Sequence, residues 1–196
     1  MPTLKQTPSQ TVGPFFAYGL CPTQYSYDLP SLFTPTIADA DAAGQHVLII
    51  GQVWDGAGQP IPDALIEMVQ ADANGRYVAT PEAMNASGFR GFARVGTGTD
   101  PQHRFIVETI KPGSTAADAA PHIDIIVMMR GVLLHAFTRL YFDDEAEANA
   151  RDAVLSRIPE QRRATLIARR EPGVARAIYR FDIRMQGPDE TVFFDL

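Results

Sequence analysis

Turn-forming residues divide the chain from His46 onward into short segments in which apolar and polar side chains alternate. The 15 glycines and 15 prolines are scattered along the chain instead of gathering in runs. In the segment ALIEMVQ, residues 64–70, successive side chains would point to opposite faces of a strand. Turn signals recur about every ten residues, a spacing that is typical of β-sandwiches and leaves little room for long helices.

The expected fold class is therefore mainly β, a single-domain β-sandwich of about seven to eight strands. Two short helices are expected before the last strand. Acidic residues in 143–150 predict the first helix, and Pro159 with Glu160 predicts a second one over 161–170. Residues 80–88 are expected to form a loop. The expected strands are 46–55, 64–70, 89–95, 104–110, 122–129, 133–142, 177–185 and 191–194.

Residues 1–45 show no convincing periodicity of helix or strand and are expected to form an extended N-terminal arm in front of a domain at 46–196. Six prolines preclude a long helix in this arm. Its aromatic side chains favour packing of the arm, either against its own domain or against a partner. These aromatic residues are Phe15, Phe16, Tyr18, Tyr25, Tyr27 and Phe33.

The composition narrows the classes of function. A net charge of −6 and a pI near 5.1 argue against nucleic-acid binding, which needs clustered basic residues. Cys21 is the only cysteine, so the sequence contains no disulfide framework. The first ten residues do not resemble a signal peptide, and no apolar run is long enough to predict a membrane span. We therefore expect a cytoplasmic protein that binds neither membrane nor nucleic acid.

One pair of polar residues stands at the start of an otherwise apolar strand. His122 and Asp124 precede and interrupt the run IDIIVMM, and in a strand they would lie on the same face. Burying either group without a partner costs about 2–7 kcal/mol or more. The two residues therefore either satisfy each other and their neighbours, or belong to a site that holds a ligand.

Several long segments resemble the intradiol ring-cleavage dioxygenases. They are TPSQTVGPFF, GQVWDGAGQPIPDALIEMVQADANGRY, TIKPG with APHI, LYFDDEAEANA, YRFDIRMQG and ETVFFD. The similarity covers nearly the whole chain in the same order. It implies an oxidoreductase that uses dioxygen to open a small aromatic ring between two adjacent hydroxyls. In this family a ferric ion is held by two tyrosinates and two histidines, which suit a hard cation.

The resemblance also implies that this chain has lost half of that ligand set. Tyr77 and His122 match a tyrosine and a histidine of the family, but Thr115 stands at the second tyrosine and Asp124 at the second histidine. Ala119 replaces an arginine that assists the reaction. This pattern resembles the non-catalytic chains of heteromeric family members. It implies no catalytic or metal-binding residue here, with Fe(III) held by a partner, the beta subunit.

Three further residues are expected to contribute to substrate binding in that partner's pocket. By resemblance, Gly13 and Pro14 would form part of the pocket wall, since glycine allows close approach and proline fixes the backbone. Arg130 would lie near the mouth of the pocket. The alternatives are a solvated arginine at a strand end and an arm that only packs on its own domain.

Other interpretations of the polar residues remain open at this stage. Tyr77, His122 and Asp124 could form a three-ligand metal site, with Asp118 as a further ligand. His122 and Asp124 could also begin a two-histidine, one-carboxylate site completed by His135. A purely structural pair would have Asp124 accept a hydrogen bond from His122 or a backbone amide. The whole chain could then be a self-sufficient dioxygenase with an atypical metal site, or a non-catalytic interaction module.

Overall fold

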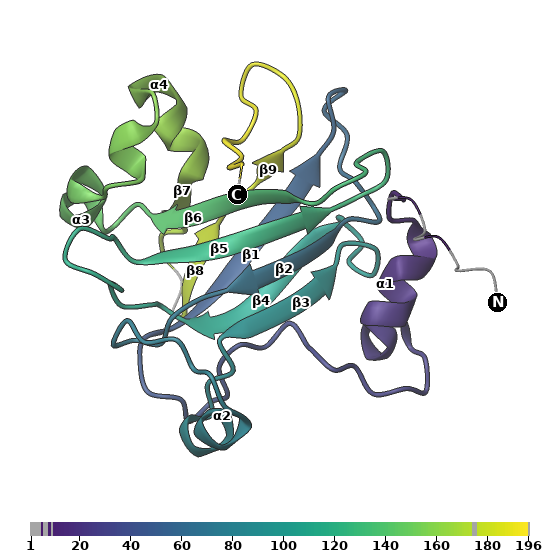
Figure 1. Ribbon diagram of the computed structural model, residues 1–196, viewed down its shortest axis with the longest axis horizontal. Coiled ribbons are helices and arrows are strands. Elements are labelled where there is room, and N and C mark those ends of the chain that lie inside the picture. The colour runs from purple at the N-terminus through teal and green to yellow at the C-terminus, as the bar shows by residue number, and fades with distance from the viewer. Residues whose placement is uncertain (1–4, 6–7, 9, 174–175, 196) are drawn as a thin grey trace.

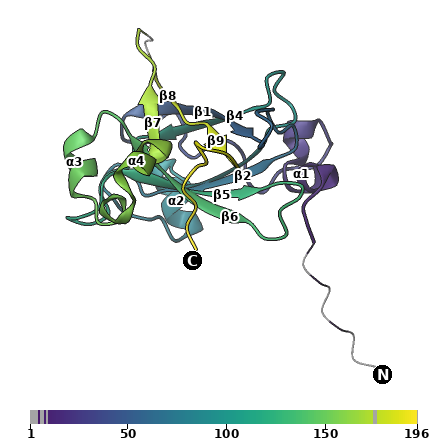
Figure 2. The same cartoon turned by 90° about the horizontal axis from the view of Figure 1, so that it is seen from above.

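The computed structural model describes residues 5, 8, 10–173 and 176–195, and their strands form two packed layers (Figure 2). One layer has the strand order β3–β2–β5–β6 and the other β8–β1–β4, with β9 also paired to β1. The β-sandwich prediction is confirmed. The strands are β1 (His46–Trp54), β2 (Leu65–Val69), β3 (Phe92–Gly96), β4 (Arg104–Ile110), β5 (His122–Met128), β6 (Ala136–Phe142), β7 (Ile167–Arg170), β8 (Ala177–Arg180) and β9 (Ile183–Arg184).

The core lies between the two layers and follows the alternation of the sequence. In β5, Ile123, Ile125 and Val127 are fully buried, whereas Asp124 and Ile126 on the other face are half-buried. In β1, Val47 and Ile49 are fully buried in the same way. Each buried aliphatic side chain contributes about 1.5–3 kcal/mol through removal from water, so both strands are fixed with one face inward.

Strand β7 joins the two layers. Its first residues pair in parallel with the end of β6, through Tyr141↔Ile167, and its last residues pair antiparallel with β8, through Arg170↔Tyr179. The prediction of a helix over 161–170 is therefore wrong in its second half. Only α4 (Glu160–Arg163) and η3 (Ala164–Leu166) are helical there, because the open edges of β6 and β8 provide hydrogen-bond partners for the residues that follow.

The other differences from the predictions are local. The expected loop at 80–88 contains the helix α2 (Pro81–Ser87), capped by the Thr80 hydroxyl and ended by Gly88 at φ +64°. The strand expected over 177–185 is divided into β8 and β9, and that expected at 191–194 is reduced to a single bridge between Phe137 and Phe194. The remaining helices are α1 (Pro14–Leu20), η1 (Pro22–Tyr25), α3 (Ala146–Arg151) and η2 (Leu155–Arg157).

The part of the arm from α1 onward lies along the outside of the sandwich (Figure 1). Helix α1 lies at one end of the molecule and α3 at the other (Figure 1). Further on, Ile37 is fully buried and its amide donates to the Glu108 carbonyl at 2.8 Å, so this part packs on its own domain. Within the described residues no helix combines the length and apolarity needed to cross a membrane.

Candidate functional site

The outward face of β5 carries the polar pair singled out by the sequence. Asp124 is directly opposite Arg139 of β6, and the Arg139 Nε donates to Asp124 Oδ1 at 2.7 Å. The Asp124 side chain is 39% exposed and that of Arg139 22%, so the pair is only partly screened by solvent. The carboxylate expected to pair with His122 or an amide instead accepts from a guanidinium on the neighbouring strand.

His122 faces a different partner from the one predicted. Its Nδ1 donates to the Ala120 carbonyl at 2.7 Å, and its Nε2 lies 4.0 Å from Asp124 Oδ2, too far for a hydrogen bond. Burial lowers the pKa of His122 below 6.5, so the ring is neutral at pH 7. The prediction that Asp124 accepts from His122 or a backbone amide is therefore wrong, although the structural role itself fits the geometry.

A buried carboxylate below this face holds the surrounding loop. Asp152 is 1% exposed and accepts from the Tyr141 hydroxyl at 3.0 Å and from the Ala120 amide at 2.8 Å. The amides of Val154 and Leu155 donate to the same group at 2.9 and 2.8 Å. Four donors on one carboxylate satisfy its desolvation cost, and they fix Ala120, whose carbonyl orients His122.

Two turns place Tyr77 and Thr115 at the edge of the site. Gly75, with φ +76°, packs so closely that a Cβ there would lie 1.9 Å from the Ser114 carbonyl oxygen. A Cβ on Gly113 would lie 2.5 Å from the Ala73 carbonyl oxygen, and the Gly113 amide donates to the Asp72 carbonyl at 2.9 Å. Both turns therefore depend on glycine. Together they bring the turn before Tyr77, which matches one family ligand, against the turn that carries Thr115, which replaces another.

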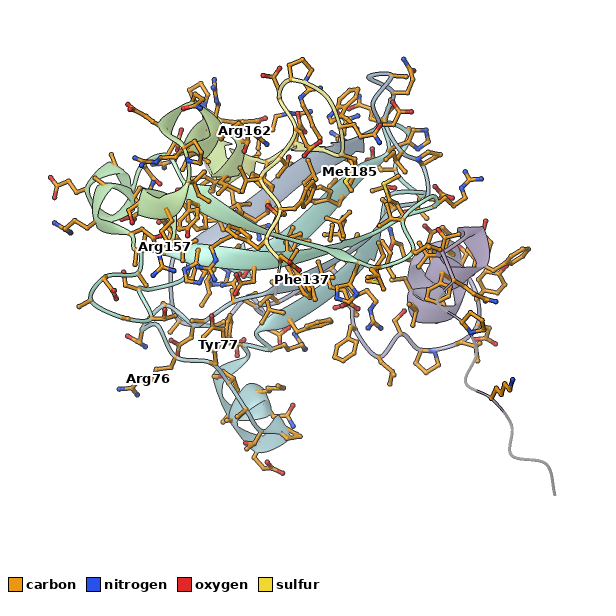
Figure 3. All side chains as sticks on the ribbon, turned by 45° about the horizontal axis from the view of Figure 1, so that its top comes forward. Arg76, Tyr77, Phe137, Arg157, Arg162 and Met185 are labelled. Atoms are coloured by element: carbon orange, nitrogen blue, oxygen red, sulfur yellow. The ribbon has the colours of Figure 1, made fainter. Side chains whose placement is uncertain are left out.

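Tyr77 is exposed and sits in the loop beyond the strands (Figure 3). Its side chain is 52% exposed. Partial burial, followed by the negative charge of Asp124, raises the pKa of Tyr77 above 10. Tyr77 therefore has no positively charged partner of its own that favours its phenolate more than Asp124 opposes it.

These side chains do not fit the ferric ion that the family uses. Thr115 stands in place of the second tyrosine, and the carboxylate of Asp124, which replaces the second histidine, is already paired with Arg139. Across the described residues no cluster of three or more His, Cys, Asp or Glu could hold a metal. The guanidinium of Arg139 supplies a positive charge beside the carboxylate.

Beside the ion pair the sheet face is hollowed by a pocket of about 350 Å³. Its walls are mainly apolar and come from β2, β5, β6, the loop after α3 and the C-terminal segment. Phe137 lies over this face of the sheet (Figure 3). The lining residues are Val69, Asp124, Ile126, Phe137, Thr138, Arg139, Val154 and Phe194.

Arg139 is the site residue that sequence reasoning missed. A signal for it was present, because the pairs Asp124↔Arg139 and His122↔Tyr141 are symmetric about Gly131 and Val132, the turn of the β5–β6 hairpin. Counting outward from that turn would have placed Arg139 opposite Asp124. The difficulty is that strand register depends on the turn geometry, which one glycine does not determine.

The segments that carry the three expected substrate-binding residues meet at the tip of this hairpin. The Thr11 hydroxyl donates to the Met129 carbonyl at 3.2 Å and accepts from the Gly131 amide at 2.9 Å. The arm just before Gly13 and Pro14 is thereby joined to the hairpin tip that carries Arg130. Arg130 itself pairs with Asp63, and its side chain remains 58% exposed.

Large apolar side chains are exposed on both of the segments that meet here. Phe15 and Phe16 of α1 are 83% and 50% exposed, and Leu133 and Leu134 of the hairpin tip are 64% and 67% exposed. We call these four side chains the arm–hairpin patch. A Cβ built on Gly13 would meet no atom within 4 Å, so the chain's own packing does not require a glycine there.

Comparisons with known proteins give a consistent result. A family model described as Dioxygenase matches residues 25–187. The chain is 66% identical over 197 residues to the protocatechuate 3,4-dioxygenase alpha chain of Burkholderia cepacia, covering 100% of both chains. It is also 30% identical over 169 residues to the beta chain of that organism, covering 79% of this chain and 70% of the other.

Solved structures agree on the fold. The dioxygenase domain of a carbohydrate-binding fusion protein from Streptomyces sp. SirexAA-E superposes with a TM-score of 0.62 at 21% identity. The alignment covers 98% of this chain and 100% of that one.

Proposed function

The chain belongs to the intradiol ring-cleavage dioxygenases, a family of non-haem ferric enzymes, and from this premise we propose that it is the non-iron-binding alpha subunit of a protocatechuate 3,4-dioxygenase. The assembled enzyme would use dioxygen to cleave protocatechuate between its two hydroxyls, yielding 3-carboxy-cis,cis-muconate. The ferric ion would be held by the beta subunit. This chain would supply scaffold, interface and part of the wall of its partner's pocket.

The Asp124–Arg139 ion pair is the observation that carries this proposal. Where the family has a histidine ligand, this chain has Asp124, whose negative charge is already neutralised by Arg139 of the same chain. Replacing that pair by a metal would require breaking the 2.7 Å hydrogen bond and leaving two like charges, the guanidinium and the cation, close together. A self-sufficient dioxygenase with an atypical site is therefore not favoured, and a module unrelated to catalysis fails to explain the full-length similarity.

The arm–hairpin patch supports the role in a heteromer. Large apolar side chains exposed on two segments that hydrogen bonds join are typical of an interaction site. Gly13 directly precedes α1 and Arg130 directly precedes Gly131, which binds Thr11, so a partner docked on both segments would have both residues within reach. Arg130 pairs with Asp63 through its Nε but remains 58% exposed, so its terminal N–H groups would attract the carboxylate of protocatechuate, and Gly13 would let the backbone come close to the ring.

Two measurements test the proposal. Purified alone, the full chain should contain no stoichiometric iron and show no charge-transfer colour from an iron-bound tyrosinate. Expressed together with a beta chain that retains both tyrosines and the His-x-His pair, it should form a complex that consumes dioxygen on addition of protocatechuate. Iron and colour in the lone chain, or full activity of the beta chain without it, would reject the proposal.

Variants separate the roles of individual residues in that complex. Tyr77→Phe should leave iron content and turnover within about tenfold of the parent complex, which corresponds to about 1.4 kcal/mol. Arg130→Ala should raise the KM for protocatechuate more at low than at high ionic strength, because salt screens an exposed charge. An unchanged KM at both ionic strengths would remove Arg130 from the substrate-binding residues.

A further inference from the structure

A second hollow, of about 420 Å³, lies away from β5, between α4, η3, β7, β8 and β9. These elements lie together on the same side of the molecule in both ribbon views (Figures 1 and 2). Three arginines from three different strands line it: Arg169 of β7, Arg180 of β8 and Arg184 of β9. Such a concentration of guanidinium groups contrasts with the net charge of −6 of the chain.

Two of these arginines face each other across neighbouring strands. Arg169 and Arg180 are directly paired in the antiparallel register of β7 and β8. Side chains in such a pair lie on the same face with Cβ atoms about 4.5–5.5 Å apart, and like charges there repel. Negative charge between the two groups would relieve this repulsion.

The chain itself supplies that charge only in part. Arg180 lies 3.5 Å from Asp182 and donates to the Gln52 side chain at 3.0 Å. Asp182 also accepts a hydrogen bond from the backbone amide of Gln52 at 3.0 Å. Arg169 and Arg184 have no carboxylate within 4.0 Å among the described residues.

We propose that this hollow is a binding site for a small multivalent oxyanion, a polycarboxylate or a phosphate compound. Guanidinium groups bind both chemistries through paired N–H donors. The volume falls within the about 300–1,000 Å³ of small-molecule sites. Asp182 and Asp189 also line the hollow and would repel a ligand beside them, so the anionic groups would sit toward Arg169 and Arg184.

The site contains its own spectroscopic reporter. Trp54 is the only tryptophan of the chain, and the Arg184 guanidinium lies 5.6 Å from the centre of its ring. An anion that draws Arg184 toward the hollow would change the environment of the indole. Citrate and pyrophosphate should therefore each be titrated into the full chain at constant ionic strength, with Trp54 emission and heat of binding recorded in parallel.

The matched variants are Arg169→Gln, which removes a guanidinium from the hollow without touching Trp54, and Arg157→Gln, which changes an exposed arginine of η2. We expect saturable heat with at least one anion, weakened about tenfold by Arg169→Gln and unchanged by Arg157→Gln. Binding of citrate alone would identify a polycarboxylate site, and binding of pyrophosphate alone a phosphate site.

The proposal is overturned if neither anion binds saturably below about 1 mM, or if Arg169→Gln binds as tightly as the parent chain. Thermal unfolding of both variants checks that each remains folded. Because no turnover is measured, the outcome is independent of the subunit assignment above.

Discussion

Arg139 decides whether the carboxylate of Asp124 is available to a metal, because its guanidinium is already bound to that carboxylate. A carboxylate on a half-buried strand face either recruits a cation from outside or is paired from within. Here the guanidinium of Arg139 also approaches the Tyr141 hydroxyl, at 3.5 Å, so it connects the pair to the buried carboxylate of Asp152. The pair is therefore part of the fold of this region.

Removing Arg139 should accordingly cost stability. In Arg139→Gln, Asp124 would lose its charge partner beside an apolar hollow, and we expect unfolding to become easier by about 1–2 kcal/mol, or roughly 2–8 °C in Tm. The matched control is Arg90→Gln, which breaks a pair with Asp39 whose side chains are 47% and 43% exposed. Exposed pairs contribute little, so equal losses in thermal unfolding of both variants would contradict a special role for Arg139.

His122 leads to a prediction about pH. Because burial lowers its pKa below 6.5, the folded protein resists a proton that the unfolded chain accepts. Stability should therefore be complete above pH 6.5 and fall as the pH drops from about 6.5 toward the lower folded pKa. Denaturant unfolding from pH 8 to 5 should show this fall in the parent chain and a smaller one in His122→Gln.

The control for this experiment is His135→Gln, since His135 is exposed. That variant should keep the pH dependence of the parent chain. The depressed pKa of Asp100, about 2, acts only at more acidic pH and lies outside this window. A fall of equal size in His122→Gln would mean that another group is responsible.

At the level of elements, local sequence patterns located the strands of the core but not those that connect the layers. Strands β1, β2, β4 and β5 follow the predicted alternation, because each has one face against the core. Strand β7 does not, since its residues are set by two neighbours distant in sequence. Basic residues at 169–170 indicated a helix end, yet they are the strand residues that pair with β8.

The candidate site was likewise predicted only in part. The positions of Tyr77, Thr115, His122 and Asp124 followed from resemblance and turn spacing, and the two glycine turns bring the first two together as described. The partner of Asp124 did not follow, because it depends on strand register. Contacts between the arm and the β5–β6 hairpin also could not be predicted, since they join residues more than a hundred positions apart.

The packing of the two turns can be tested with a pair of glycines. Gly75 and Gly58 have nearly the same φ, +76° and +72°, but only Gly75 is crowded by backbone. Gly58→Ala should therefore cost about 1–2 kcal/mol, from the left-handed conformation alone. Gly75→Ala should cost about 1–3 kcal/mol more, because its Cβ would force the turns apart. Urea unfolding measures both, and equal losses would contradict the proposed contact.

At the scale of the whole molecule, the two ends of the sandwich differ in character. The residues of the arm–hairpin patch at the end with α1 are exposed and apolar, whereas the exposed residues of α3 and α4 at the other end are small or polar. Figure 1 shows these two ends. Apolar surface of this kind contributes roughly 25 cal/mol per Å² when a partner covers it. The boundary between arm and domain at residue 45 remains a prediction. Within the arm, the exposed apolar residues Phe15 and Phe16 lie in its first part.

Gly13 offers the sharpest test of that surface. A phenylalanine at this position would meet no atom of the chain's own fold within 4 Å of its Cβ, so the domain should fold normally. If the beta subunit docks there with its pocket against the arm, Gly13→Phe should prevent assembly or raise the KM for protocatechuate at least about tenfold. Deletion of residues 1–16 should have the same effect.

The control is Ala150→Phe on α3, at the opposite end (Figure 1), which should assemble normally. Sedimentation and oxygen uptake of the complexes report both properties, and circular dichroism reports the fold. Should Gly13→Phe assemble and turn over protocatechuate with an unchanged kcat/KM, the arm only packs on its own domain, and neither Gly13 nor Pro14 belongs to the pocket wall.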